Sequence, residues 1–429
     1  MKKRLIKYGG AITGLDEERA IICSIKRSRK TRNWQEAEEG AKFSQEAANF
    51  LGVKYGILTN SGSSAGLLAL SALELPNGSE VIISAVTFPT IFNIILQCGL
   101  VPVVVDAKVG TYGFDVKDVE KAITKKTKAI IAIHPLGNPV DMPELMKLVK
   151  KYENRKQKIW VLEDACDAWS SSIGKNKVGS FGDVSITSFH AAHIVSMGVG
   201  GGVFTDDKRI AQKVRMYRDW GRQADINKSE NKKHKTLPKD YNPRFIYEKI
   251  GYNFQILELQ AAMGRVQLRK IKQIKEARKR NFDYLAKHLS KYEDLIMPEV
   301  IEGADVCWFA FPLTYKGDRG KLLRHLEKNG IETRPLFSGN IIAHPAYQSV
   351  KYRVSGKLDG ADYIMKHSFW ISLHPSLTKS DLEYMVKIFS NFFNSENHEE
   401  HMKIHKLDSF EEQGLKMVKA HQKYLYGKN

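Results

Sequence analysis

The chain has 429 residues, with 67 lysine and arginine side chains against 48 aspartate and glutamate side chains, and its formal net charge is +19. A chain of this length can bury a large core and is expected to form two domains. The composition is that of a globular protein. The four cysteines are too scattered for a zinc site or a disulfide framework, and the longest apolar region, residues 81–107, is broken by prolines and reads as strand–helix–strand rather than a membrane span.

The N-terminus and the charge pattern bear on location and partners. The basic start leads into a short mixed stretch that does not resemble a signal peptide, so a cytoplasmic protein is expected. Positive charge concentrates in residues 26–32, 122–128, 228–239 and 265–280. This charge fits the attraction of anionic ligands such as a nucleotide diphosphate, or simply a solvated lysine-rich surface. No basic motif interleaved with aromatic residues points to nucleic acid.

The first two parts of the chain are a helical segment and a large α/β domain. Residues 1–50 are expected to be mostly helical, with a polar break around residues 28–33. In residues 51–285, apolar strands alternate with helical stretches, which predicts a mostly parallel seven-stranded sheet with helices on both faces. The expected strands are Tyr55–Leu58, Glu80–Ser84, Val101–Val105, Ala129–His134, Ile159–Glu163, Val184–Ser188 and Gly202–Thr205.

The later parts of the chain are less regular. The polar, lysine-rich residues 223–249 predict a long, mobile loop. Residues 255–290 predict one long amphipathic helix, and residues 286–394 predict a smaller α+β domain. The charged tail, residues 395–429, is compatible with one further helix, Phe410–Tyr426.

Several side chains fall at the carboxyl ends of the predicted strands, where parallel sheets bind their ligands. They are Phe88, His134, Asp164 and Ser188. In addition, residues 61–64 (Ser-Gly-Ser-Ser) precede an alanine-rich apolar run and therefore open a helix. The free N–H groups and the dipole at a helix start attract phosphate, although a serine there is also an ordinary helix cap.

Three segments, in their order along the chain, carry a resemblance to a known family. They are Asn60-Ser61-Gly62-Ser63-Ser64-Ala65, the apolar strand with its acids at residues 160–168, and Ser188-Phe189-His190-Ala191-Ala192-His193 followed by the glycine-rich residues 198–202. Together they resemble the DegT/StrS sugar aminotransferases, which use pyridoxal phosphate (PLP). The resemblance implies an α/β structure of the PLP-dependent aminotransferase fold type I.

The resemblance also implies which residues bind the cofactor. Asp164 matches the acid that keeps the pyridine nitrogen protonated, so that the ring can accept electrons. Asp167 is expected near the ring hydroxyl, and Phe88 is expected to stack on the ring. Asn253 is expected to reach the cofactor site of a neighbouring subunit, which implies a homodimer. The implied phosphate contacts are Gly62, Ser63, Ser64 and Ser188.

His193 lies where the family's aminotransferases have the lysine that holds PLP as a Schiff base. A neutral imidazole cannot form that bond, but it can transfer protons near neutral pH. The substitution therefore indicates dehydration of a sugar rather than transamination. The alternative is a PLP-binding regulatory relative without turnover, although the cofactor motifs around His193 are retained.

Further motifs resemble the lysine-less branch of the family, the nucleotide-4-keto-6-deoxyhexose 3-dehydratases of the ascarylose and colitose pathways. The motifs are residues 217–222, 251–253, 331–335 and 338–340, and the resemblance covers roughly residues 5–395. It implies removal of the C3 hydroxyl with pyridoxamine phosphate (PMP) as cofactor and His193 as base. An amino donor such as glutamate would restore PMP, and the product would feed a surface polysaccharide such as the lipopolysaccharide O-antigen. Arg334 and Asn340 are the implied substrate contacts.

The ascarylose-pathway relatives also carry a [2Fe–2S] cluster on a cysteine-rich loop that follows the motif at residues 217–222. This chain has no cysteine in residues 222–250, and such clusters need thiolate ligands. We therefore expect neither a cluster nor another metal. Two other possibilities stay open: a different keto sugar as substrate, or transfer of an unsaturated intermediate to a separate reductase. The glutamate that relatives usually have in the turn after His193 is replaced by Val199.

Overall fold

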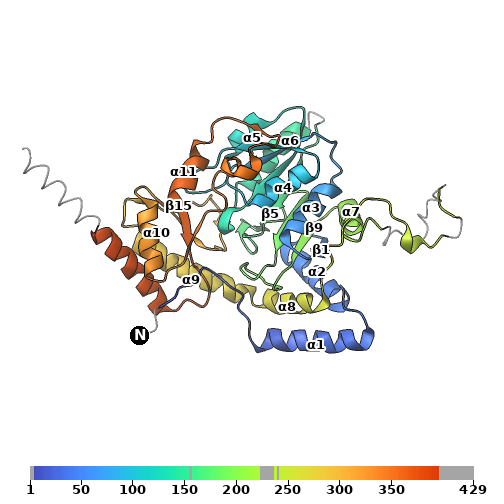
Figure 1. The fold of residues 1–429 in the computed structure, drawn as a ribbon, viewed down its shortest axis with the longest axis horizontal. Helices are drawn as coiled ribbons and strands as arrows, with labels where there is room; N and C mark the ends of the chain where they lie inside the picture. The colour runs from blue at the N-terminus through green and yellow to red at the C-terminus, as the bar shows by residue number, and fades with distance from the viewer. Residues whose placement is uncertain (1–3, 154–156, 223–235, 239–240, 396–429) are drawn as a thin grey trace, which may run out of the picture.

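The computed structural model describes residues 4–153, 157–222, 236–238 and 241–395 (Figure 1). The predicted tail helix and most of the predicted loop at residues 223–249 lie outside the described residues. The described chain forms a large α/β part around one sheet, and a smaller α+β part that lies beside it.

The large sheet has eight strands, and seven of them are the strands predicted from the sequence. Strand β9 runs antiparallel to β1 and β8, and the other pairs are parallel. The prediction of seven strands was one short, because β14 has two residues and is too short to show an alternating pattern. In sheet order the strands are β1 (Tyr55–Thr59), β9 (Gly201–Thr205), β8 (Val184–Ser188), β5 (Trp160–Asp164), β4 (Thr127–Ile133), β2 (Glu80–Ser84), β3 (Val101–Val105) and β14 (Arg353–Val354).

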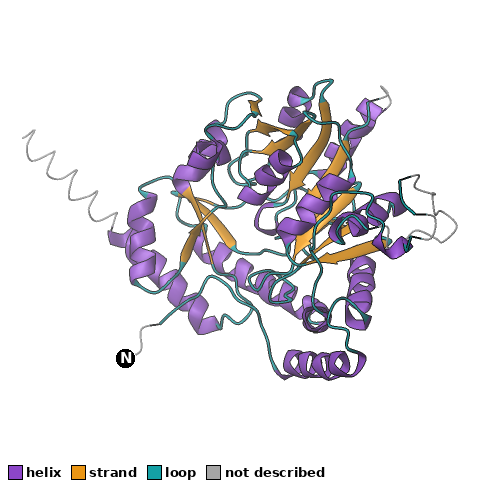
Figure 2. Cartoon of the chain, turned by 45° about the vertical axis from the view of Figure 1, so that its right-hand side comes forward, coloured by secondary structure: helices purple, strands orange, loops and turns teal. Residues whose placement is uncertain are grey.

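Helices cover both faces of this sheet (Figure 2). The central strands are therefore continuous apolar runs, as expected where neither face meets water. On one face, Ile83 and Ile131 pack with the helices α3 (Gly62–Ala72), α4 (Pro89–Gln97) and α7 (Lys208–Arg218). On the other face, Ile82 and Ile130 pack with α5 (Val116–Ala122) and α6 (Met142–Glu153).

The N-terminal segment is helical, as predicted, and its two helices α1 (Leu15–Thr31) and α2 (Glu38–Leu51) both pack on α8 (Glu258–Arg269). The single helix predicted over residues 255–290 is wrong, because α8 ends at Arg269 and α9 (Ile271–Leu289) begins after Lys270. A tertiary contact accompanies the break: the Lys270 ammonium donates to both carboxylate oxygens of the buried Glu17 of α1, at 2.7 and 2.8 Å. The amphipathic pattern does not record such a contact.

The smaller part has a four-stranded antiparallel sheet with helices packed on it, in agreement with the α+β prediction. Its strand order is β10 (Leu295–Ile296), β12 (Phe311–Tyr315), β15 (Ser368–Ile371) and β13 (Thr333–Pro335). The helices are α10 (Arg319–Lys328), α11 (Asp359–His367) and a helix over residues 379–395. A three-stranded sheet joins β11 (Ala304–Asp305), β6 (Ser172–Ile173) and β7 (Asn176–Lys177).

The two parts do not separate at a single point of the sequence. Ile6 belongs to the core of the smaller part, whereas Leu336, Ile341 and Ile364 pack into the core of the large part. Short 3-10 helices lie at Pro135–Gly137, Pro243–Phe245, Ile341–Ala343 and Pro345–Tyr347. Within the described ranges, none of the helices combines the length and the apolar character needed to cross a membrane.

Candidate active site

A cavity of about 560 Å³ opens at the carboxyl ends of β4, β5 and β8, the place where parallel sheets bind ligands. The large part contributes residues from these strand ends and from the start of α3, and the smaller part contributes residues from β13 and β15. Eight of the site residues predicted from the sequence line this cavity: Gly62, Ser63, Phe88, Asp164, Asp167, Ser188, His193 and Arg334.

The start of α3 is built as an anion cradle. The hydroxyl of Ser61 accepts the N–H of Ser64 at 3.1 Å, and the Ser61 carbonyl accepts the N–H of Ala65 at 3.0 Å. Gly62 and Ser63 lie between the residues that these bonds join, and both border the cavity. A Cβ atom on Gly62 would lie 2.7 Å from the Cβ atom of Ser188, so the close approach of α3 to β8 requires glycine. Backbone N–H groups and serine hydroxyls at a helix start fit the phosphate of PLP.

Asp164 lies at the end of β5, where its side chain is almost completely buried, with 8% of its surface exposed. Its carboxylate accepts the N–H of Cys166 at 3.1 Å. Burial raises the pKa of Asp164 above its usual range, and the nearby charge of Asp167 acts in the same direction. A buried carboxylate with a raised pKa is stabilised by a cation next to it. A protonated pyridine nitrogen beside Asp164 would be such a cation. The residues present therefore fit the ring as well as the phosphate of PLP.

His193 is paired with Asp167. The Nδ1 atom of His193 lies 3.3 Å from the Oδ1 atom of Asp167, which is an ion-pair distance without hydrogen-bond geometry. The ring of Phe309 lies beside the imidazole, with 5.5 Å between the centroids. His190 lies on another side, at 6.3 Å. Burial, together with the proximity of His193, lowers the pKa of His190 below 6.5. The arrangement can hold and move one proton beside the cofactor cradle.

His134 forms part of the cavity wall, and buried contacts hold its ring in place. Its Nδ1 atom accepts the N–H of Val140 at 3.3 Å, and its Nε2 atom lies 3.3 Å from the Glu163 carboxylate. Both side chains are completely buried. Glu163 in turn accepts three backbone N–H groups of the loop at residues 179–182, at 2.7–2.8 Å. The pair fixes the wall next to Asp164.

Three of the predicted site residues do not line the cavity. Ser64 is turned to Ser61, as described above. Asn340 has 5% of its surface exposed and donates from its amide to Asp362 at 2.7 Å. Asn253 is exposed and forms a backbone bridge with Asp219. The substrate contact of Asn340 and the contact of Asn253 with a neighbouring subunit stay predictions.

The structure also adds residues that the sequence did not single out. Tyr8, Phe309, Phe337 and Trp370 line the cavity, and the centroid of Trp370 lies 5.9 Å from that of Tyr8 and 5.7 Å from that of Phe309. Tyr8, Phe309 and Trp370 come from distant segments and share no motif, so no local signal identifies them, whereas Phe337 lies between the motif residues 331–335 and 338–340. His190 and Cys166 also line the cavity, and both lie within the motifs that carried the family resemblance.

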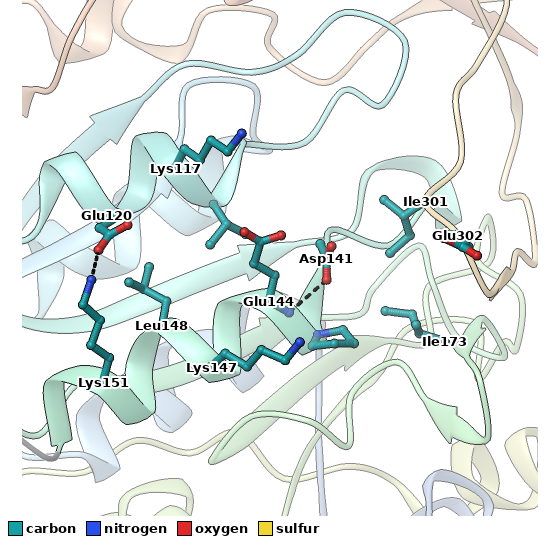
Figure 3. A pocket seen from close by; sticks show the side chains of 12 residues that line it. Lys117, Glu120, Asp141, Glu144, Lys147, Leu148, Lys151, Ile173, Ile301 and Glu302 are labelled. Carbon is teal, nitrogen blue, oxygen red and sulfur yellow. Dashed lines mark hydrogen bonds and ion pairs between the residues drawn. The ribbon is translucent and has the colours of Figure 1, made fainter.

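A second cavity, of about 710 Å³, lies between α5 and α6 (Figure 3). Two of its charged side chains pair with each other, since Lys151 bonds to Glu120, and the Asp141 carboxylate accepts the backbone N–H of Glu144 at 2.9 Å. None of the predicted cofactor residues borders it. Among the residues that the structure describes, no group of three His, Cys, Asp or Glu side chains could hold a metal ion.

Comparison with known proteins finds relatives whose names point to lipopolysaccharide biosynthesis and to a nucleotide-linked sugar. Lipopolysaccharide biosynthesis protein RfbH of Salmonella typhimurium is 40% identical over 372 residues, which cover 82% of this chain and 84% of the relative. The dTDP-4-dehydro-2,6-dideoxy-D-glucose 3-dehydratase of Saccharopolyspora spinosa is 37% identical over 407 residues, which cover 90% of this chain and 86% of the relative.

A solved structure and a family profile agree with these relatives. The structure of a GDP-4-keto-6-deoxymannose-3-dehydratase with a trapped PLP–glutamate geminal diamine superposes with a TM-score of 0.81 at 25% identity, over 89% of this chain and 99% of that one. The profile of the DegT/DnrJ/EryC1/StrS aminotransferase family matches residues 16–390. With its PLP-type cradle, its aminotransferase fold and these matches, the chain belongs to the DegT/DnrJ/EryC1/StrS aminotransferase family.

Proposed function

We propose that this protein removes the C3 hydroxyl from a nucleotide-linked 4-keto-6-deoxyhexose, with PMP as cofactor and His193 as the proton-transferring residue. The observation that carries the proposal is His193 itself. It stands at the family's lysine position, lines the cavity beside the cofactor cradle, and is paired with Asp167. The similar proteins reported above whose names include 3-dehydratase support the same reaction class.

The residues of the cavity have separate roles in the proposed reaction. When bound, PMP supplies an amine for the sugar ketone and a ring that accepts electrons. Asp164 would hold the proton on the ring nitrogen, while Gly62, Ser63 and Ser188 would hold the phosphate and Phe88 would cover the ring. This assignment leaves His193 free for the substrate side.

His193 is suited to move a proton in both directions. The Asp167 carboxylate favours the tautomer with the proton on Nδ1, which leaves Nε2 without one. Nε2 can then take a proton during the reaction and return it to the departing C3 oxygen. A contact of 3.3 Å is long for a working hydrogen bond, but such contacts often tighten only when the substrate is in place.

We further propose that an amino donor such as glutamate restores PMP, and that no iron–sulfur cluster takes part. The glutamate bound in the similar dehydratase structure supports the donor. The sequence supports the second statement, since residues 222–250, which follow the motif at residues 217–222, contain no cysteine. Cys23 lies on α1, Cys307 is buried and Cys166 lines the cavity, so these side chains do not share one loop.

We also propose a cytoplasmic homodimer as the active unit, with no nucleic-acid or membrane partner. Two apolar side chains that line the cavity are largely exposed, Phe88 at 56% and Val199 at 52%. Leu257 is exposed too, and the Gln260 amide from the same helix start donates to the Val199 carbonyl at 2.8 Å. Exposed apolar side chains around a cavity mouth are typical of a surface that a partner covers. A second copy would place its Asn253 there.

The first test follows the cofactor of the purified protein. We expect the absorbance of bound PLP to change to that of PMP when glutamate is added, and borohydride treatment to leave the intact mass without a cofactor adduct. Adding CDP-, GDP- or dTDP-4-keto-6-deoxyhexoses should then return the PLP spectrum and give a 3-deoxy-4-keto sugar and ammonia, identified by mass spectrometry and NMR.

The outcomes separate the alternatives. A stable adduct of wild-type protein would mean that a lysine reaches the cofactor, and the role of His193 would be wrong. Bound PLP that never cycles with any of the three sugars would favour a regulatory protein. An unsaturated sugar that becomes the 3-deoxy product only when a reductase is added would favour transfer to a partner enzyme.

A further inference from the structure

The N-terminal segment forms part of the cavity wall, although the rest of that wall comes from much later residues. Ile6 donates its N–H to the carbonyl of Gly330 at 2.7 Å, and its carbonyl accepts the N–H of Glu332 at 3.0 Å. The Arg4 guanidinium holds Asp381 at 2.6–2.9 Å. A Cβ atom on Gly330, which has a φ of +76°, would lie 2.1 Å from the Arg4 carbonyl oxygen. These close contacts of residues 4–6 place Tyr8 at the cavity.

Tyr8 stacks against the guanidinium of Arg334. The Cζ atom of Arg334 lies 4.2 Å from the centroid of the Tyr8 ring, and both residues line the cavity. The N–H of Tyr8 donates to the Glu332 carboxylate at 3.0 Å, and the same carboxylate oxygen lies 3.9 Å from Nη2 of Arg334. Tyr8 is therefore fixed through its backbone, and its ring presents a face on which a guanidinium is held by a cation–π interaction.

Arg334 is the one lysine or arginine among the residues that line this cavity in the described part of the chain. Its Nη1 atom donates to the Thr333 carbonyl at 2.7 Å, and its side chain remains 42% exposed. Among the described residues, the nearest carboxylate recorded for Arg334 is that of Glu332 at 3.9 Å, so no tight ion pair within this part of the chain neutralises the charge. A guanidinium held over an aromatic ring is suited to phosphate or carboxylate oxygens, which it can bind with two parallel hydrogen bonds.

We infer that Tyr8 is a positioning residue that holds Arg334 ready to bind the anionic oxygens of the substrate. The inference rests on the proposed function, which brings two anions to the cavity in turn: the diphosphate of the nucleotide sugar and the carboxylates of the amino donor. Tyr8 does not touch the reacting atoms. It acts by keeping the guanidinium over its ring and at the cavity wall.

The test measures equilibrium binding of unreactive probes to the PLP-loaded protein by calorimetry. The probes are CDP, GDP and dTDP for the diphosphate, and glutarate for the dicarboxylate of an amino donor. Arg334→Gln should weaken binding of at least one probe class by about 10- to 100-fold, the range for a hydrogen bond to a charged group. Tyr8→Leu should weaken the same class by about 2- to 30-fold, the range for a cation–π contact.

Matched variants separate positioning from general damage. Tyr8→Phe keeps the ring face and should bind like wild type. Tyr384→Leu removes a second stack on the same N-terminal segment, where the Arg4 Cζ lies 5.1 Å from the Tyr384 centroid outside the cavity, and it should also bind like wild type. Arg334→Lys keeps the charge without the planar fork and should recover only part of the affinity.

The results decide the inference independently of turnover. Weakening for the nucleotides alone assigns the diphosphate to Arg334, weakening for glutarate alone assigns the donor, and weakening for both assigns a shared site. Unchanged binding of every probe to Arg334→Gln overturns the inference, and so does an unchanged Tyr8→Leu beside a weakened Arg334→Gln. If Tyr8→Leu unfolds, the salt dependence of probe binding is measured instead for wild type, Tyr8→Phe and Arg334→Gln. Tyr8→Phe should then match wild type, and Arg334→Gln should differ from both. A protein that binds as expected but yields no 3-deoxy sugar would refute the proposed function and leave this inference standing.

Discussion

The Nδ1 atom of His193 lies 3.3 Å from the Oδ1 atom of Asp167, and Asp167 follows Asp164 by three residues at the end of the same strand. In the proposed function, one strand end therefore supplies both the acid for the ring nitrogen and the acid beside the imidazole. A lysine at this position would place an amine in the cavity, whereas His193 lies next to the carboxylate of Asp167. In the proposed function, this pairing provides a group that carries a proton, where the family's lysine would bind the cofactor covalently.

His193→Asn should abolish 3-deoxy sugar formation and keep PLP bound. General acid–base catalysis by a side chain contributes about 10²- to 10⁴-fold, and the phosphate cradle and Asp164 do not depend on the imidazole. Product analysis gives the rate, and absorbance gives the bound cofactor. His288→Asn, at a ring stacked on Tyr284 along α9, is the control. A rate close to that of wild type would refute the role of His193.

His193→Lys should let borohydride fix PLP to the protein. The substitution places a primary amine where the imidazole lines the cavity. We expect an increase in intact mass after reduction, which wild-type protein would not show. The measurement is independent of the sugar substrate. Lack of an adduct in a folded variant with bound PLP would mean that this position does not face the cofactor.

Asp167→Asn should lower kcat by about 10- to 100-fold with little change in PLP affinity. An amide cannot favour the Nδ1-protonated tautomer of His193 as a carboxylate does. The hydrogen bond expected when this contact tightens around the substrate would be worth about 1.5–3 kcal/mol. Steady-state kinetics with separate kcat and KM values provides the check. A loss confined to PLP binding would assign Asp167 to the ring hydroxyl instead.

Asp164→Asn should weaken PLP binding by about 10- to 100-fold and stabilise the cofactor-free protein at neutral pH. Burial raises the pKa of Asp164 in the folded state. An acid with a raised folded pKa favours folding below its unfolded pKa, near 3.8, and this benefit is lost as the pH rises through the folded pKa. Urea unfolding should therefore show a larger advantage of the variant at pH 7 than at pH 4. An equal difference at both pH values would refute this explanation.

Arg353→Met should lower the free energy of unfolding by about 1.5–3 kcal/mol at pH 7. Arg353 of β14 donates to both oxygens of Glu80, at 2.9 and 3.1 Å, and to the Ala122 carbonyl at 2.7 Å. Burial acts to raise the pKa of Glu80, but hydrogen bonds from Arg353 and Thr124 outweigh it and lower the pKa.

The pH dependence of that variant follows from the lowered pKa of Glu80. The stability that comes from the ionised Glu80 is present above the pKa of Glu80 in the unfolded chain, near 4.5. It is lost as the pH falls through the lower pKa of Glu80 in the folded protein. Urea unfolding at pH 7 and near pH 3 should thus show a smaller effect at the lower pH. Lys351→Met, an exposed position two residues earlier, should have little effect at either pH. An undiminished loss in acid would assign the stabilisation to the Ala122 carbonyl.

The large sheet and its acids could be predicted because their signals are local. Strands covered on both faces are continuous apolar runs, and a polar residue directly after such a run falls at a ligand-binding edge. Asp164 and Ser188 are of this kind, and both line the cavity. The cradle at residues 61–63 also has a local signal, since it opens a helix.

The features that the sequence did not reveal depend on contacts between distant segments. The break at Lys270 accompanies an ion pair with Glu17 of another helix, and Tyr8 reaches the cavity through backbone bonds to residues 330–332. Asn340 lies in a motif beside Arg334, yet its amide is taken up by Asp362 while Arg334 lines the cavity. Chemistry read from a motif does not tell which of its members faces the ligand.

The pairing of β14 with β3 constrains the order in which the chain can mature during its synthesis. The outer edge of β3 keeps unpaired N–H and C=O groups until residues 353–354 have left the ribosome. An open strand edge is a template for intermolecular pairing. A chain that stops after residue 285, where the large domain ends by sequence, would carry this open edge permanently. The α/β part is therefore completed late in translation, and it cannot be produced as an independent unit without exposing a surface prone to aggregation.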